Sequence, residues 1–221
     1  STLGEYLLRD VDLPFGGPFG LTSFIVDFLL SPATMQVSDG SGRLTGQVGG
    51  QIISEIPDSH PMYLVPNGYL LPSNVGLTRQ ITGTAAGSYS YGSISPDGLS
   101  LSLTNVPTQM GQSDRVLVNA DGSRVRVVPG DSKTLNLTMG RLVGDTARGV
   151  SIENFLASPT DDLDVTSTPD LSMVRLSNRG AAARVDVKLL GFDMPRRDRM
   201  ALARGALNIP SGKDLVIAVA D

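Results

Sequence analysis

From residue 33 onward, apolar and polar residues alternate along most of the chain. Met35 and Val37, for example, alternate with Gln36 and Ser38. Because successive side chains of a strand point to opposite faces, this pattern predicts strands with one buried face. Comparable signals recur at short intervals, in segments 51–56, 76–82, 88–94, 99–103, 115–118, 124–128, 134–139, 171–176, 184–190 and 215–220.

Turn chemistry separates these segments. Residues 96–98 (Pro-Asp-Gly) and 120–122 (Ala-Asp-Gly) supply residue types that tolerate positive φ in a hairpin. Many short strands with such turns are typical of a sandwich or a barrel. We therefore expect an all-β protein built from two antiparallel β-sandwich domains, at residues 31–140 and 141–221.

Residues 1–30 differ from the rest and are expected to form an N-terminal leader and a helix. The apolar residues of segment 21–30 follow the helical spacing i, i+3, i+4, i+7, i+8; they are Leu21, Phe24, Ile25, Phe28 and Leu29. Ser31-Pro32 would end this helix, because the residue before proline avoids the helical region. Segment 196–204 (RRDRMALAR) is compatible with either a short helix or a charged strand.

The amino-acid composition supports the all-β prediction and limits the classes of partner that we expect. The 221 residues include 25 Gly and 14 Pro but no Trp, and the formal net charge is only −4. Without a basic stripe that could neutralise phosphates, nucleic acid is not expected as a partner. The longest apolar run, 21–30, is too short to span a bilayer, so we expect no membrane span.

The residues of common catalytic sites are missing. No G-x-S-x-G pentapeptide is present for the nucleophile elbow of an α/β-hydrolase, and there is no cysteine. His60 is the single histidine, and we interpret it as a loop residue rather than a general base. We therefore expect no enzymatic activity.

One acidic loop is a candidate metal site. Calcium prefers oxygen ligands, and the aspartates that could supply them are Asp161, Asp162, Asp164 and Asp170. The alternative is a solvated acidic loop, because the glycine and terminal glutamate of an EF-hand are missing. No other cofactor is expected.

Tyrosines and one apolar loop are the candidate contact residues. A protein-binding surface could be formed by the tyrosines Tyr63, Tyr69, Tyr89 and Tyr91. Of these, Tyr89 and Tyr91 share a strand face, so we expect this pair to point into the core. The run 61–72 (PMYLVPNGYLLP) is apolar for a loop. It either folds over the sandwich edge or docks on a neighbouring molecule.

Two stretches resemble known secreted modules. The first combines Ser31-Pro32, segment 35–39 (Met-Gln-Val-Ser-Asp), Gly42-Arg43, Gly46, Gly50, segment 55–57 (Glu-Ile-Pro) and segment 87–89 (Gly-Ser-Tyr). It resembles a β-sandwich region found behind lipase-like α/β-hydrolase domains of secreted bacterial proteins.

The second stretch is segment 174–190 around Asn178 and Gly180, followed by 209–213 (Ile-Pro-Ser-Gly-Lys). It resembles the immunoglobulin-like adhesion modules of bacterial surface proteins. Together these resemblances imply immunoglobulin-like domains, an extracellular or cell-surface location and an accessory role.

These observations lead to two hypotheses. The first is a non-catalytic structural or interaction module, a self-associating surface or filament-type subunit that contacts itself or another surface protein through residues 1–30 and the 61–72 loop. The alternative is the accessory C-terminal β-sandwich region of a secreted lipase-like hydrolase. A hydrolase motif upstream of Ser1 would favour the alternative.

Overall fold

The computed structural model describes residues 24–30, 32–62, 65–143, 146–193 and 198–218. In these segments the regular structure is entirely β-strand, and 18 strands form two antiparallel sheets of nine strands each. The all-β class and the antiparallel sandwich are therefore confirmed. Residues 1–23 of the predicted leader lie outside the described residues.

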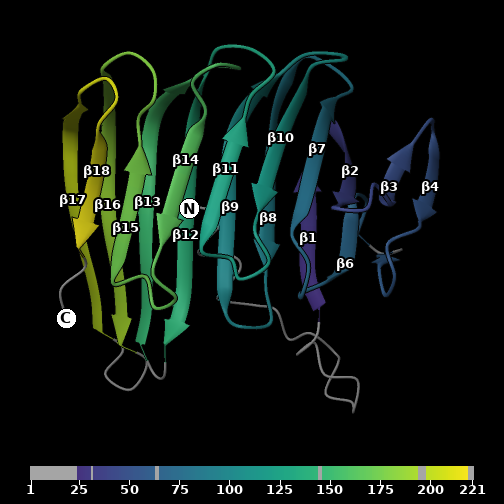
Figure 1. Ribbon diagram of the computed structural model, residues 1–221, viewed down its shortest axis with the longest axis horizontal. Helices are drawn as coiled ribbons and strands as arrows, with labels where there is room; N and C mark the ends of the chain where they lie inside the picture. Colours follow the sequence, from purple (N-terminus) through teal and green to yellow (C-terminus); the bar gives the residue numbers. More distant parts are fainter. Residues whose placement is uncertain (1–23, 31, 63–64, 144–145, 194–197, 219–221) are drawn as a thin grey trace.

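We call the two sheets A and B. Sheet A contains, in spatial order, β17 (Asp198–Ile209), β16 (Ala183–Asp193), β13 (Thr146–Ala157), β12 (Lys133–Val143), β9 (Leu99–Thr108), β8 (Gly87–Ile94), β1 (Phe24–Leu30), β6 (Gly68–Pro72) and β5 (His60–Pro61). Sheet B contains β18 (Asp214–Ala218), β15 (Met173–Ser177), β14 (Leu163–Ser167), β11 (Arg124–Val128), β10 (Ser113–Val118), β7 (Leu77–Gly83), β2 (Ala33–Asp39), β3 (Leu44–Val48) and β4 (Gln51–Ser54). The strands run across the long axis of the molecule, from β3 and β4 at one end to β17 and β18 at the other (Figure 1).

From β8 onward, hairpins alternate between the two sheets. The hairpins β8–β9, β12–β13 and β16–β17 belong to sheet A, whereas β10–β11 and β14–β15 belong to sheet B. Each hairpin pairs with the preceding hairpin of its own sheet, and β18 pairs with β15 in the same way. The sandwich therefore grows in one direction along the chain.

This growth corrects the expectation of two separate sandwiches. The predicted boundary between residues 140 and 141 falls inside β12, which pairs with β9 on one side and β13 on the other. Strands from 31–140 and from 141–221 thus share both sheets. The alternation shows which face of a strand is buried but not which sheet the strand joins. The order of strands also differs from that of the seven-stranded immunoglobulin sandwich.

The predicted helix at 21–30 is wrong over its described part, because residues 24–30 form strand β1. Ile25, Asp27 and Leu29 point inward, and the residues between them point outward. The outward residues of β1 are also apolar. One of them, Phe28, lies with its ring over Gly92 of β8, where an added Cβ would lie 2.1 Å from the ring. Apolar residues on both faces produced the apparent helical spacing.

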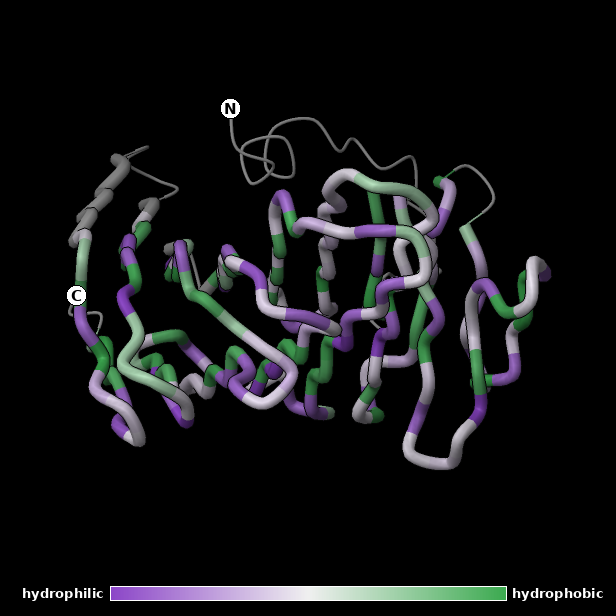
Figure 2. The backbone as a smooth tube through the Cα atoms, turned by 90° about the horizontal axis from the view of Figure 1, so that it is seen from above, coloured by the Kyte–Doolittle hydropathy of each residue, from purple (hydrophilic) through white to green (hydrophobic). Residues whose placement is uncertain are grey.

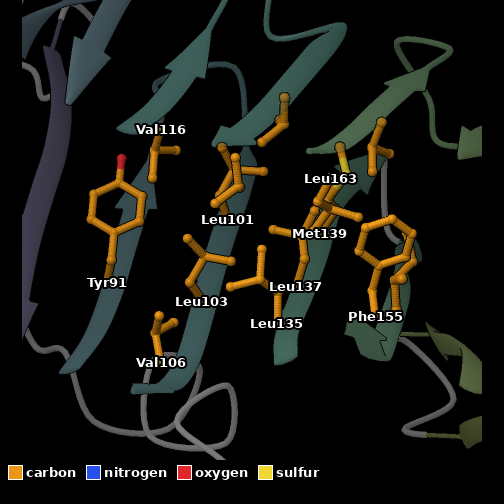
Figure 3. Packing of buried hydrophobic residues seen from close by; sticks show 14 of the residues in the cluster. Tyr91, Leu101, Leu103, Val106, Val116, Leu135, Leu137, Met139, Phe155 and Leu163 are labelled. Carbon is orange, nitrogen blue, oxygen red and sulfur yellow. The ribbon is translucent and has the colours of Figure 1, made fainter. Parts of the chain in front are cut away.

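One continuous core lies between the sheets. Leucine, valine and isoleucine side chains dominate it, and Figure 3 shows how residues from several strands meet around Leu103 and Leu137. Tyr89 and Tyr91 are both 1% exposed, so they point into the core as expected. Along the strands, hydrophobic and hydrophilic residues alternate (Figure 2).

The apolar run 61–72 folds onto its own sandwich. It contributes Pro61 to β5 and all of β6, and Tyr69 and Leu71 are buried. Of the two alternatives for this run, packing on the molecule's own edge therefore accounts for Tyr69 and Leu71, whereas Tyr63 lies outside the described residues. In segment 196–204, β17 begins at Asp198, so the described part of this segment is strand.

Candidate functional site

A buried ion pair joins the two sheets at the middle of the sandwich. Lys133 of sheet A donates to both carboxylate oxygens of Asp114 in sheet B at 3.0 Å and to the carbonyl of Pro107 at 2.9 Å. Asp114 also accepts from the Tyr89 hydroxyl and from the Gly130 amide, each at 2.8 Å. Burial raises the pKa of Tyr89, and the negative charge of Asp114 adds to the shift. This cluster is well satisfied, as a buried pair must be.

A second buried ion pair joins β1 to β7. Arg79 donates through Nε to Asp27 Oδ2 at 2.7 Å and through Nη1 to the Leu77 carbonyl at 3.1 Å. Burial alone would lower the pKa of Arg79, but the charges of Asp27 and Tyr91 and their hydrogen bonding together outweigh burial and raise that pKa. Burial also raises the pKa of neighbouring Tyr91, although the charge of Arg79 opposes this shift.

The second pair is less completely satisfied than the first. Within the described structure, Arg79 Nη2 and Asp27 Oδ1 are buried without a hydrogen-bond partner. Arg79 also lines a cavity of about 150 Å³, together with Ser93 and the turns 95–97 and 119–122. This cavity is smaller than usual ligand pockets. We therefore interpret the Asp27–Arg79 pair as a structural link between the two sheets and not as part of a binding site.

The predicted calcium loop is not assembled as a metal site. Asp162 pairs with Arg126. Asp164 pairs with Arg124 at 2.6 Å and with Arg179 at 3.3 Å. The hydrogen bond from Arg124, which outweighs burial, lowers the pKa of Asp164. Arginines across the strand pair thus occupy both carboxylates.

The other two aspartates of the loop point elsewhere. Asp170 accepts from the backbone amide of Ser172, whose hydrogen bonds lower the pKa of Asp170, and it pairs with Arg148. The Asp161 carboxylate lies against Gly180. The described residues contain no group of three His, Cys, Asp or Glu that could hold a metal, so the structure gives the calcium prediction no support.

His60 lies on the short strand β5 and is exposed. Its ring makes an edge contact with Phe24, with the ring centroids 6.3 Å apart. Ser59, its neighbour in sequence, is buried and hydrogen-bonds to Thr45 at 2.6 Å and to the Ile56 carbonyl at 2.6 Å. These contacts are structural, and the interpretation of His60 as a non-catalytic residue stays a prediction.

The C-terminal end of the sandwich is the strongest candidate for an interaction site. We call strands β16–β18, residues 183–218, the open end. Within the described residues, β17 pairs only with β16, and β18 pairs only with β15. The backbone groups on the far sides of β17 and β18 are therefore available to another strand.

The core is also incompletely covered at the open end. Several apolar side chains pack against the core there but are only partly buried; they are Ala183, Leu189, Leu207 and Leu215. On the outer face of sheet B, Met173 and Val216 are 45% and 49% exposed. An additional pair of strands would cover both the backbone groups and the partly buried leucines.

The opposite end is better protected. We call strands β1–β7, residues 24–83, the closed end. Its outermost strands are short, with four residues in β4 and two in β5, and β5 contains Pro61. Between them Ile56 is 2% exposed and caps the core. Short strands, proline and a covering segment are the usual protection of a sheet edge.

Sequence reasoning missed both ion pairs, although a signal was present. Asp27 lies at an inward position of the alternation in β1, and Arg79 lies at an inward position of β7. A charged residue at an inward position needs a partner across the core. Asp114 occupies such a position on β10.

The described part of the chain contains no helix long and apolar enough to cross a membrane. The chain matches no family model, no curated protein and no solved structure.

Proposed function

We propose that this protein is a non-catalytic extracellular module that associates with itself, as a subunit of a surface or filament-type assembly. The observation that carries the proposal is the open end, where, among the described residues, the outer edges of β17 and β18 have no partner strand and part of the core is only partly buried. Edges of this kind pair with further strands. The extracellular location rests on the resemblance to secreted sandwich modules.

The rest of the molecule fits a structural role. The two buried ion pairs join one sheet to the other, and their charged groups lie in the core rather than in a substrate-sized pocket. The candidate general base His60 has a ring neighbour, Phe24, as its described contact. Association through an edge needs none of these groups to be reactive.

Sedimentation velocity of the full chain over a dilution series tests the proposal. We expect a monomer at low concentration and a larger species at high concentration. Val216→Lys places a charge at the exposed edge of β18 and should weaken association by about tenfold or more, equivalent to about 1.4 kcal/mol.

Ile52→Lys is the matched control, because Ile52 is 62% exposed on β4 of the closed end. It should leave association unchanged. A chain that sediments as a monomer at every concentration contradicts the proposal.

A further inference from the structure

Strands β8–β18 contain an internal repeat that the sequence does not display. In each sheet-A hairpin the pairing register shifts once, at Tyr89/Tyr91, at Leu135/Leu137 and at Val185/Val187. Opposite each shift, one residue of the second strand has a left-handed conformation. These residues are Asn105, Asn154 and Ala206, with φ values of 52°, 60° and 61°.

The hydrogen bonds at the three bulges are also equivalent. The residue skipped by the register shift points its polar side chain at the bulge and accepts the amide of the left-handed residue. Ser90 Oγ accepts from Asn105 at 3.2 Å, Asn136 Oδ1 from Asn154 at 2.9 Å, and Asp186 Oδ1 from Ala206 at 2.6 Å. The bulges recur about every 50 residues, a spacing typical of structural repeats.

The sheet-B hairpins repeat as well. In the turn between β10 and β11, Asp121 accepts the Ser123 amide at 3.0 Å, and Gly122 has a φ of 67°. In the turn between β14 and β15, Asp170 accepts the Ser172 amide at 3.0 Å, and Leu171 has a φ of 55°. One repeat is therefore a sheet-A hairpin followed by a sheet-B hairpin.

Comparison of the three copies shows which strand pairings are missing among the described residues of the open end. In the first two copies, the outer edge of the sheet-A hairpin pairs with the next sheet-A strand, as β9 pairs with β12 and β13 with β16. The first sheet-B strands, β10 and β14, pair on their outer sides with β11 and β15. Strands β17 and β18 hold the corresponding places in the third copy. Within the described residues, no strand covers the outer sides of β17 and β18.

We propose that a second copy of this chain supplies that cover, by packing open end against open end around a two-fold axis perpendicular to the sheets. This inference rests on the proposed function and names its surface and partner. Such an axis places β17 antiparallel to its own copy in sheet A and β18 antiparallel to its own copy in sheet B. One rotation therefore completes both sheets at once, as a self-complementary interface requires.

The residues of β18 suit this arrangement. With the axis at Val216, the inward Leu215 faces Ile217 of the second copy, so the apolar core continues through the interface. On the outer face, Val216 meets its own copy and Asp214 meets Ala218, so no like charges are opposed. Pairing with the closed end of another copy is disfavoured, because β17 has 12 residues and β5 has two.

Disulfide trapping tests the inference, since the chain has no cysteine of its own. Directly opposed residues of antiparallel strands have Cα atoms about 4.5–5.5 Å apart, within the range of a disulfide. The full chain carrying Val216→Cys should give a disulfide-linked dimer as the major product under mild oxidation. The same chain carrying Ile52→Cys, a comparably exposed site on β4, should stay monomeric.

The outcomes separate the inference from the proposed function. If the full chain self-associates but Val216→Cys is not trapped, or is trapped no better than Ile52→Cys, the two-fold interface is wrong while the proposed function stands. Mixed disulfides between Val216→Cys and Ile52→Cys chains would show head-to-tail assembly and also overturn it. A monomer at all concentrations would remove the proposed function itself.

Discussion

The two ends of the sandwich differ in how well their sheet edges are protected. At the closed end, short strands, Pro61 and buried Ile56 protect the sheet edges, and the Asp27–Arg79 pair ties one sheet to the other. At the open end, the described strands have no partner on the outer sides of β17 and β18, and the nearby leucines are only partly buried. Within the described residues, the chain covers its own sheet edges at the closed end, whereas the edges of β17 and β18 are left for the partner that we propose.

Removing the charge of Arg79, which pairs with Asp27 between the sheets at the closed end, should change the stability of the protein most. Arg79→Met leaves the buried carboxylate of Asp27 without its partner, so we expect the free energy of unfolding to fall by about 3–5 kcal/mol. Urea unfolding measures this change. The double variant Asp27→Leu/Arg79→Met should recover most of the loss, because both charges are then gone.

The open end supplies the matched control for that variant. Arg175 pairs with Asp214 at 3.2 Å, and both side chains are substantially exposed. Arg175→Met should therefore change stability by less than about 1 kcal/mol. Equal effects of Arg79→Met and Arg175→Met would contradict the contrast between the two ends.

Acid should weaken the strands next to the open end. The pKa of Asp164 on β14 is lowered by its hydrogen bond with Arg124, so the folded state favours the charged carboxylate. The resulting stability is present above the unfolded pKa of about 3.9 and is lost as pH falls through the lower folded pKa. We expect Asp164→Asn to make the pH dependence between about pH 5 and 2 shallower, by about 1 kcal/mol.

Urea unfolding at several pH values measures this slope for the natural chain and for Asp164→Asn. Asp97→Asn is the comparison, since Asp97 pairs with Arg141 at 2.8 Å but its side chain is 48% exposed. It should alter the slope less. An unchanged slope in Asp164→Asn would show that this pair does not stabilise the fold.

The repeat itself predicts the smallest effect, a gain in stability at the open end. Ala206 adopts a left-handed conformation that asparagine tolerates better, and the other two copies have asparagine there. Ala206→Asn should stabilise the protein by about 0.5 kcal/mol, a rise in Tm of about 1–2 °C. The reverse change, Asn154→Ala, should lower Tm, and a lower Tm in Ala206→Asn would contradict the equivalence of the bulges.

The sequence predicted the strands and the sandwich because alternation reports directly on burial. It did not show the single sandwich, since the pairing of distant strands such as β9 and β12 leaves no local pattern. β1 was mistaken for a helix because both of its faces are covered by apolar groups. The repeat was hidden because it consists of bulge geometry, and polar residues as different as Ser90 and Asp186 serve the same role.

Amide hydrogen exchange of the full chain at two concentrations tests the central claim most directly. Our account predicts that residues 214–218 of β18 exchange more slowly at high concentration than at low concentration, because pairing protects their amides. Residues 51–54 of β4 should exchange equally in both samples. The account is contradicted if β18 exchanges at the same rate at both concentrations, or if protection appears at β4 instead.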